Sequence, residues 1–294
     1  MKTIDFALDS RIYALFKGDP GTGKSIAAAS FPKPYFFALD GNIKAPIAYW
    51  RPRGKEFEYD FYSTFLSINK KLEEFNAYCP YETIVIDGIT SLADIIINDM
   101  IRTRDPGAKK VMRAGIESAQ IEDYGGEARG LQVILDNLKA VSINRGIHAI
   151  VTAHVIQVES TDLVKKTTSV SRQLLTAGNK VAVKLPKDFD EAYHFDVQGN
   201  MDITQDPIYT VVTKNTGYDW AKTALPLPTR IKFTNGSLYD IIMSHLKDYP
   251  HVHSVNSSAV ANQANSANPE SNPTPSSDAS KLVGDMFKKK SWNI

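Results

Sequence analysis

Eight consecutive residues near the start of the chain have the types and spacing of a phosphate-binding loop. They match the pattern G-x-x-x-x-G-K-[ST] at every fixed position and read Gly18-Asp19-Pro20-Gly21-Thr22-Gly23-Lys24-Ser25. Glycine at three of these positions permits a backbone in which successive N–H groups point at one anion. The Lys24 amine would reach the β- and γ-phosphates, and the Ser25 hydroxyl would hold Mg²⁺. The sequence therefore predicts that the chain binds ATP with Mg²⁺.

Three polar residues follow buried apolar runs further along the chain and are candidates for the same site. Asp87 closes the β-branched run 83–86, which has the form of a Walker B strand. Asp40 follows a second apolar run, and His154 closes a third. Because parallel strands present ligands at their carboxyl ends, we predict that these side chains lie beside the loop. Asp87 would orient Mg²⁺, Asp40 the attacking water, and His154 would sense the γ-phosphate, although a histidine satisfied by backbone carbonyls is the alternative.

The elements that must position these residues follow from hydrophobic periodicity. Apolar or β-branched runs predict strands, and amphipathic periodicity predicts helices. The predicted strands are 12–16, 35–39, 83–87, 147–154, 189–195, 208–213 and 229–233, and the predicted helices are 64–78, 91–104, 127–144 and 238–246, with another beginning at 26. Residues 42–60, 105–126 and 157–182 are expected to be irregular. The order predicts an α/β fold with a mostly parallel central sheet and helices on both faces.

Composition sets further bounds. The formal net charge of +1 predicts no global attraction to nucleic acid or membrane, so any nucleic-acid site must be a local patch. A single cysteine, Cys79, fits a reducing compartment. We see neither a signal peptide nor an apolar run of membrane-spanning length, and we expect a cytoplasmic protein without membrane contact. The region 1–249 is predicted to be one domain, followed by a disordered linker, 250–280, and a terminal partner-binding peptide, 281–294.

The phosphate loop, the Walker B strand and the strand that closes at His154 together resemble the RecA-like ATPase core. More narrowly, the chain resembles the RecA-core ATPases that bacteriophages encode and that are grouped with single-strand-annealing recombinases of the Sak type. The resemblance spans about residues 10–246 and rests on five stretches, Gly18 to Ser25, Ile84 to Asp87, the loop at Tyr124-Gly125, Ile150 to His154, and Leu174 to Lys180 continuing through Phe189 to His194.

This resemblance implies an ATPase that acts on single-stranded DNA in phage recombination, replication or repair, in the host cytoplasm. It also implies a single-strand-binding protein as a partner and a homo-oligomer, either a ring or a filament. One departure concerns turnover, because such enzymes commonly place a glutamate shortly after the second strand. Here the sequence is Leu39-Asp40-Gly41-Asn42, so the shorter Asp40 would take that role and hydrolysis would be slow.

Basic residues supply candidates for contacts beyond the nucleotide. Two clusters in predicted loops would contact DNA phosphates, and a solvated surface is the alternative for each. They are Lys109, Lys110 and Arg113, and Lys165, Lys166 and Arg172. Lys214 and Lys222 are candidates for cationic fingers that reach the nucleotide of a neighbouring subunit.

Two other functions fit a phosphate loop. A nucleotide kinase also begins with one, but kinases of this kind usually need an arginine-rich lid, and the basic residues here are mostly lysines in two loops. A nucleotide-dependent switch or assembly factor without DNA binding is the second alternative. Tight ATP binding without turnover would distinguish it.

Overall fold

A nine-stranded sheet forms the centre of the molecule in the computed structural model. The structure describes residues 8–9, 11–105, 107, 110–113, 116–162, 167–176, 184–198, 207–217, 220–233, 236–247 and 252–253. All of these lie in one compact unit, Met1–Val255. The strands of the central sheet are β2 (Tyr13–Gly18), β3 (Pro34–Ala38), β4 (Glu58–Phe61), β5 (Thr83–Asp87), β8 (His148–Asp162), β9 (Thr167–Leu174), β10 (Glu191–Gln198), β11 (Ile208–Val212) and β12 (Arg230–Lys232).

The strands follow the order β12-β11-β10-β2-β8-β5-β3-β4, and β9 pairs with β8 alone. Every neighbouring pair from β10 to β4 is parallel. The strand β11 is antiparallel to both β10 and β12. Two short pairs lie outside this sheet, β1 (Leu8–Asp9) with β13 (Val252–His253) and β6 (Met112–Arg113) with β7 (Ile116–Glu117).

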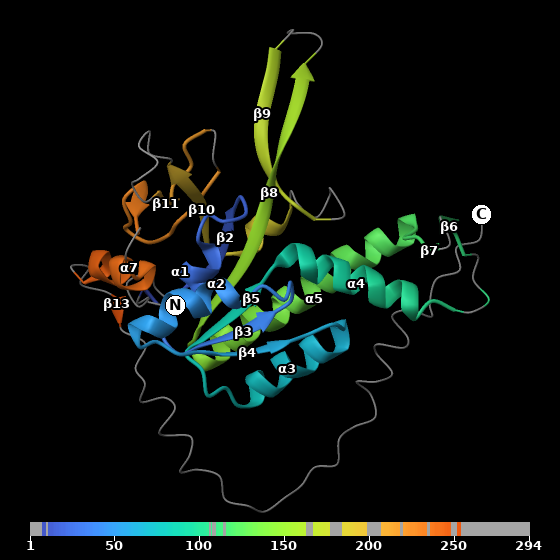
Figure 1. The fold of residues 1–294 in the computed structure, drawn as a ribbon, viewed down its shortest axis with the longest axis horizontal. Coiled ribbons are helices and arrows are strands. Elements are labelled where there is room, and N and C mark those ends of the chain that lie inside the picture. The colour runs from blue at the N-terminus through green and yellow to red at the C-terminus, as the bar shows by residue number, and fades with distance from the viewer. Residues whose placement is uncertain are drawn as a thin grey trace, which may run out of the picture. The chain divides into compact units, whose positions relative to one another are not determined.

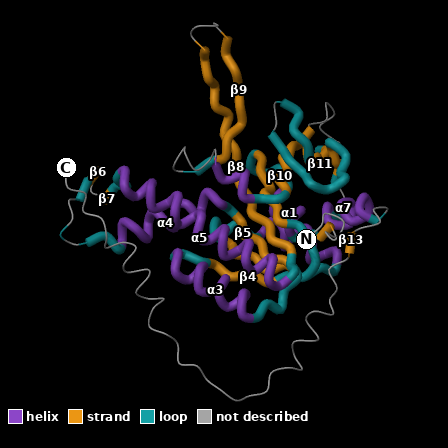
Figure 2. The backbone as a smooth tube through the Cα atoms, turned by 180° about the vertical axis from the view of Figure 1, so that it is seen from behind, coloured by secondary structure: helices purple, strands orange, loops and turns teal. Residues whose placement is uncertain are grey.

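Helices cover both faces of the sheet (Figures 1 and 2). Their bounds are α1 (Lys24–Ala28), α2 (Lys44–Trp50), α3 (Phe65–Ala77), α4 (Ile89–Arg102), α5 (Ile121–Arg145) and α7 (Leu238–Leu246), with short 3-10 turns η2 (Arg51–Arg53) and η3 (Leu185–Asp188). Alternate residues of β2 enter different cores: Tyr13 and Leu15 join the core under α3, α4 and α5, whereas Ala14 and Phe16 join the core under α1, α2 and α7. This arrangement confirms the predicted α/β fold class with a mostly parallel sheet.

The expectation of irregular structure over 42–60 was wrong. This stretch contains α2, η2 and the edge strand β4. Proline disfavours a helix interior, but Pro46 lies in the first turn of α2. The first four N–H groups of a helix have no intrahelical partner, so the missing N–H of proline costs nothing there.

The helix predicted to begin at residue 127 begins at Ile121. Gln120 caps it, and the side chains of Gln120 and Asp123 form a reciprocal capping box. Two glycines that suggested a loop therefore lie inside α5. At Gly126 an added Cβ would come within 2.0 Å of the methyl end of Met100 on α4, so this glycine leaves room for that side chain. Part of the predicted loop 105–126 is also strand, because β6 and β7 pair within it.

The expectation of irregular structure over 157–182 was also wrong, because much of this polar stretch forms a β-hairpin. The strand β8 continues to Asp162 and pairs antiparallel with β9 from Asp162 opposite Thr167 to Val155 opposite Leu174. Threonine and valine in β9 favour a strand despite their low net hydrophobicity. Figure 1 shows this hairpin extending beyond the end of the neighbouring strands.

Most of the predicted linker and terminal peptide, 250–280 and 281–294, lies outside the described residues, and these two assignments stay predictions. Val252–His253 is the exception, since it forms β13. Among the helices that the structure describes, none is long and apolar enough to cross a membrane.

Candidate nucleotide-binding site

The phosphate loop connects the end of β2 at Gly18 to the start of α1 at Lys24. Gly21 and Gly23 have φ of 80° and 86°, in the left-handed region that favours glycine. At Gly18 an added Cβ would lie 2.4 Å from the carbonyl oxygen of Phe195 in β10. Glycine is therefore required at these positions by backbone conformation and by close approach of a neighbouring strand.

The Lys24 side chain is held inside the loop. It is 6% exposed, and its Nζ donates to the carbonyl oxygens of Gly18 at 2.9 Å and Asp19 at 2.8 Å. Burial lowers the pKa of Lys24 to about 8, although the carboxylates of Asp87, Asp19 and Asp40 oppose this shift. An anionic phosphate at the loop would stabilise the charged amine, so the loop is built to gain from binding one.

The first residue of α1 after the lysine contacts the Walker B carboxylate. Ser25 Oγ donates to Asp87 Oδ1 at 2.9 Å, and Thr152 Oγ1 donates to the same oxygen at 2.7 Å. The Thr152 hydroxyl also accepts a hydrogen bond from the N–H of Gly88 at 2.8 Å. Burial raises the pKa of Asp87 to about 6, and the two hydroxyl donors and Lys24 partly offset the effect.

These residues fit a bound Mg²⁺. The ion prefers hard oxygen ligands and commonly takes one or two from protein, with water and substrate phosphates completing its shell. The Ser25 hydroxyl and the Asp87 carboxylate are such ligands, and they already lie within hydrogen-bond distance of each other. A carboxylate that is 4% exposed also gains from a cation, since its charged form is poorly solvated. When bound, Mg²⁺ would neutralise charge that develops on the phosphates.

Thr152 was missed in the sequence analysis, where its strand was predicted but the residue was given no role. A usable signal was present. Thr152 lies two residues before His154 on β8, so both side chains point to the same face of the sheet. Ile150 lies on the same face of β8 and packs in the core under α1, the helix that follows the phosphate loop. Thr152 and His154 therefore lie on the face of the sheet that α1 covers.

The structure places His154 at the site. Its backbone lies opposite Gly18 in the register of β2 and β8. The ring is half-buried, and Nδ1 makes no hydrogen bond within the described residues. Burial, reinforced by the charge of Lys24, lowers the pKa of His154. A neutral imidazole therefore lies beside the loop, and its predicted role as a γ-phosphate sensor stays a prediction.

Asp40 also lies at the carboxyl ends of the parallel strands. It comes two residues after β3, whose last residue, Ala38, pairs with Asp87. Asp40 Oδ1 accepts a hydrogen bond from the N–H of Asn42 at 2.8 Å, which fixes the carboxylate over its own turn. An added Cβ on Gly88 would lie 3.9 Å from Asp40 Cβ. Asp40 is thus close to the Walker B strand end, and its predicted role toward water stays a prediction.

Of the six predicted DNA-binding residues, only Lys110 and Arg172 have described side chains, so the two clusters stay predictions. Lys110 is exposed and makes an ion pair with Glu117 at 3.4 Å. Arg172, on β9, is half-buried, and its Nη1 lies 2.8 Å from Nε2 of His194. Arg113 lies on β6, and nothing is described of its side chain. The remaining three, Lys109, Lys165 and Lys166, lie outside the described residues.

The predicted finger residues, Lys214 and Lys222, lie away from their own phosphate loop. The backbone of Lys222 pairs with Ala192, which is opposite Leu15 rather than Gly18, and its Nζ donates to the carbonyl of Lys187 at 3.5 Å. Lys214 is exposed and follows the end of β11. Any contact with a nucleotide would have to be in a neighbouring subunit, as the prediction states.

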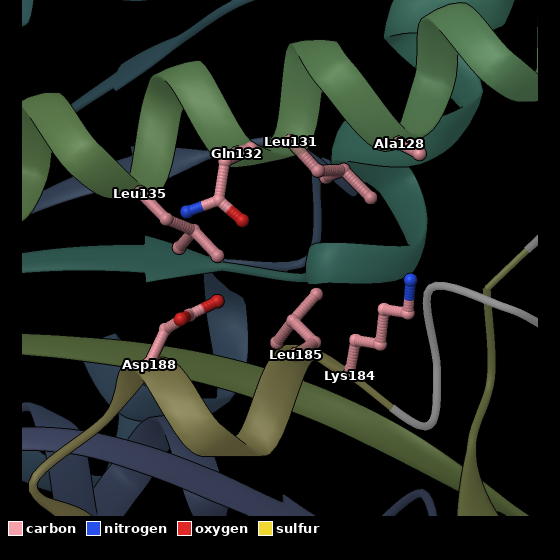
Figure 3. Close-up of a pocket in the computed structure, with 7 residues that line it drawn as sticks. All are labelled: Ala128, Leu131, Gln132, Leu135, Lys184, Leu185 and Asp188. Atoms are coloured by element: carbon pink, nitrogen blue, oxygen red, sulfur yellow. The ribbon is translucent and has the colours of Figure 1, made fainter.

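A cavity of about 280 Å³ lies elsewhere, between α5 and η3 (Figure 3). Leu131, Leu135 and Leu185 form its apolar wall, with Lys184 and Asp188 beside it. No predicted site residue lines this cavity. It is therefore not the phosphate site, which is a loop at the carboxyl ends of the parallel strands.

The fold and the loop define the class of protein, a P-loop domain with a Walker A loop, a Walker B carboxylate and a mostly parallel sheet. Residues 11–218 match the family described as "AAA domain" (AAA_24), and the chain belongs to that family. A similar solved structure is the KaiC-like protein PH0186 from the hyperthermophilic archaeon Pyrococcus horikoshii OT3, at 14% identity, 76% coverage of this chain, 84% coverage of that chain and a TM-score of 0.40. No curated protein matches the sequence. The family and the site together indicate a nucleotide-binding ATPase.

Proposed function

We propose that this protein is a Mg²⁺-dependent ATPase. The observation that carries the proposal is the hydrogen bond of 2.9 Å between the Ser25 hydroxyl and the Asp87 carboxylate, directly beside the Lys24 amine. Lys24 would bind the β- and γ-phosphates, Ser25 and Asp87 would hold Mg²⁺, and Thr152 would fix the Asp87 carboxylate. Asp40 and His154 would face the terminal phosphate, Asp40 orienting water and His154 donating a hydrogen bond.

We further propose that single-stranded DNA is the partner whose binding this turnover serves, in a recombination, replication or repair role of the kind that Sak-type phage ATPases have. The support is the long β8–β9 hairpin. Its first strand, β8, also carries His154, and the pairing with β9 begins at the next residue, Val155. Its connecting segment, 163–166, includes Lys165 and Lys166. These two lysines would contact phosphates without any large net charge on the protein.

Phosphate release measured with and without single-stranded DNA tests both parts. We expect slow turnover that single-stranded DNA increases, and none in Lys24→Ala. Thin-layer separation of radiolabelled nucleotides distinguishes a kinase, since a kinase would transfer the phosphate to a second nucleotide rather than to water. Tight ATP binding with no turnover under any condition would instead favour a nucleotide-dependent switch. The shortness of Asp40 and its hydrogen bond to Asn42 are the observations that favour this second function.

A further inference from the structure

The two strands that end the central sheet run in the same direction. The strand β4 ends the sheet on one side and β12 on the other. Because β12 is antiparallel to β11 and β11 is antiparallel to β10, β12 points the same way as β10 and the parallel strands that lead to β4. Such a sheet can continue from one molecule into the next, with β12 of a second copy placed beside β4 of the first.

The strand β4 presents acidic groups on one face of the sheet and aromatic rings on the other. Asp60 accepts a hydrogen bond of 2.6 Å from the hydroxyl of Tyr35, whose ring packs in the core under α3, so Asp60 and Glu58 lie on the α3 face. Tyr59 and Phe61 alternate with them, 38% and 62% exposed. An edge strand with exposed aromatic residues is unusual for an isolated molecule, because it invites pairing with another strand.

The strand β12 carries the complementary pattern. Ile231 is buried in the core under α1, so Arg230 and Lys232, which are exposed, lie on the opposite face. That is the α3 face, on which β4 carries Glu58 and Asp60. Two cations separated by one residue therefore match two carboxylates with the same separation, and on the same face of a continuing sheet.

We propose that the protein assembles head to tail with further copies of itself, β4 of each copy pairing with β12 of the next. Ion pairs would form on the α3 face, and Tyr59 and Phe61 would be covered on the other. The two surfaces are different, so the contact is heterologous and generates a ring or a filament rather than a closed dimer. This interface does not rest on the nucleotide site, which lies at the carboxyl ends of the strands rather than at the edges of the sheet.

Sedimentation velocity of the full chain, with and without Mg²⁺ and ATP, tests this interface. Phe61→Lys removes an aromatic ring that the contact would cover and places a charge in that covered surface, and Lys232→Glu adds an anion to β12 on the face where acidic β4 must approach. Both positions are exposed, so the fold is retained. We expect the mass of the wild type to rise with concentration and both variants to stay monomeric. Leu66→Lys, at a 64% exposed position on α3, and Lys187→Glu, on η3, are matched controls that should assemble like the wild type.

An equimolar mixture of Phe61→Lys and Lys232→Glu gives the sharper result. Each variant keeps one intact edge, so β12 of the first can pair with β4 of the second and assembly must stop there. We expect dimers in the mixture and monomers in each variant alone. A wild type that stays monomeric at every concentration, with or without nucleotide, would overturn the proposal. Assembly of either variant like the wild type would also overturn it, and ATP binding measured on the same samples separates this outcome from loss of the nucleotide site.

Discussion

Ser25 and Asp87 are 62 positions apart in the chain, and their side chains share a hydrogen bond of 2.9 Å. The serine is the second residue of α1, the helix that follows β2 and the phosphate loop. The aspartate ends β5, which is separated from β2 in the sheet by β8. The carboxylate is nearly fully buried, and its Oδ1 accepts hydrogen bonds from both this serine and Thr152, which fix its direction. A rigid pair of oxygen ligands beside a lysine amine is what a magnesium–nucleotide complex requires.

The buried Asp87 carboxylate should reduce the stability of the free protein. Its pKa is about 6 in the folded state against an ordinary value of 3.8, so folding takes up a proton and stability falls as pH rises from 4 to 6. Asp87→Asn keeps an oxygen that can accept from Ser25 and Thr152 but carries no charge. We expect this variant to be more stable by on the order of 1–3 kcal/mol at pH 8.

Urea unfolding at several pH values measures this effect. The advantage of Asp87→Asn should be full above pH 6 and should disappear toward pH 4, where the wild-type carboxylate is protonated. The same variant should lose the Mg²⁺ dependence of nucleotide binding. An advantage that does not change with pH would show that the burial of Asp87 is not its source.

Thr152 should position Asp87 without contacting the nucleotide directly. Thr152→Val removes the donor to Asp87 Oδ1 and leaves the N–H of Gly88 without its acceptor, which should destabilise the protein by about 1–3 kcal/mol. Turnover should fall more than ATP affinity, since the carboxylate loses its fixed direction. Thr152→Ser retains the hydroxyl and is the matched control. Steady-state kinetics measure turnover in both variants. Equal turnover in Thr152→Val and Thr152→Ser would contradict the positioning role of the hydroxyl.

The Lys24 amine should make nucleotide binding depend on pH. Its pKa is about 8 in the free protein, and bound phosphate would raise it, so binding takes up a proton at pH above 8. ATP affinity should be nearly constant between pH 7 and 7.5 and then fall by up to about tenfold per pH unit above 8. Fluorescence titration with a labelled nucleotide follows this change. A flat profile to pH 9.5 would contradict a buried, titrating Lys24.

Asp40 should affect turnover alone if it orients water. Asp40→Asn should bind ATP like the wild type, because Asp40 contacts neither the loop nor the Ser25–Asp87 pair through a described hydrogen bond. Its turnover should fall by about 100-fold, a typical loss for a group that assists proton transfer. Single-turnover assays at saturating ATP separate the two effects. Unchanged turnover in Asp40→Asn would assign the aspartate to its turn with Asn42.

The proposed DNA contacts should appear as a salt dependence. Neutralising roughly four phosphates would give a slope of about −3 in log affinity against log salt on single strands. Replacing Lys165, Lys166 and Arg172 by alanine should reduce that slope by about 2, from roughly 0.7 per lost contact. Because Arg172 also contacts His194, a second variant that combines only Lys165→Ala and Lys166→Ala is needed beside it. Truncation after Val255 should leave the slope unchanged, and binding that ignores salt would contradict the assignment.

The parts of the site that the sequence predicted are those with a fixed local pattern. The phosphate loop requires glycine for backbone reasons, and an apolar strand ending in aspartate is recognisable in the sequence. Lys24, Ser25 and Asp87 were therefore predicted as one group, and the structure places them close together. Thr152 belongs to no fixed motif: its alternation with His154 indicates the face of the strand, but its role depends on the hydrogen bond to Asp87, which only the structure gives. Hydrophobic periodicity predicts where strands lie in the sequence, but not their order in the sheet. That order decides which distant strands, such as β5 and β8, are neighbours.

The errors in the predicted fold have local causes as well. Pro46, Gly125 and Gly126 are residue types that favour loops, yet each lies in a helix. Pro46 is in the first turn of α2, Gly126 lies against Met100 of α4, and an added Cβ on Gly125 would meet nothing within 4 Å. The β8–β9 hairpin was missed because most of its residues are polar, so its sequence lacks the alternation of apolar and polar residues that marks a half-buried strand. In these segments, the position in the tertiary structure rather than the residue type determined the secondary structure.

Isothermal titration of ATP with Mg²⁺ into the wild type and Lys24→Ala tests the central claim most directly. The account predicts saturable binding to the wild type at a stoichiometry of about one per chain. It predicts strongly weakened binding to a Lys24→Ala protein whose circular dichroism and thermal unfolding show an intact fold. Equal affinity in the two proteins would contradict the assignment of the Gly18 to Ser25 loop as the nucleotide site.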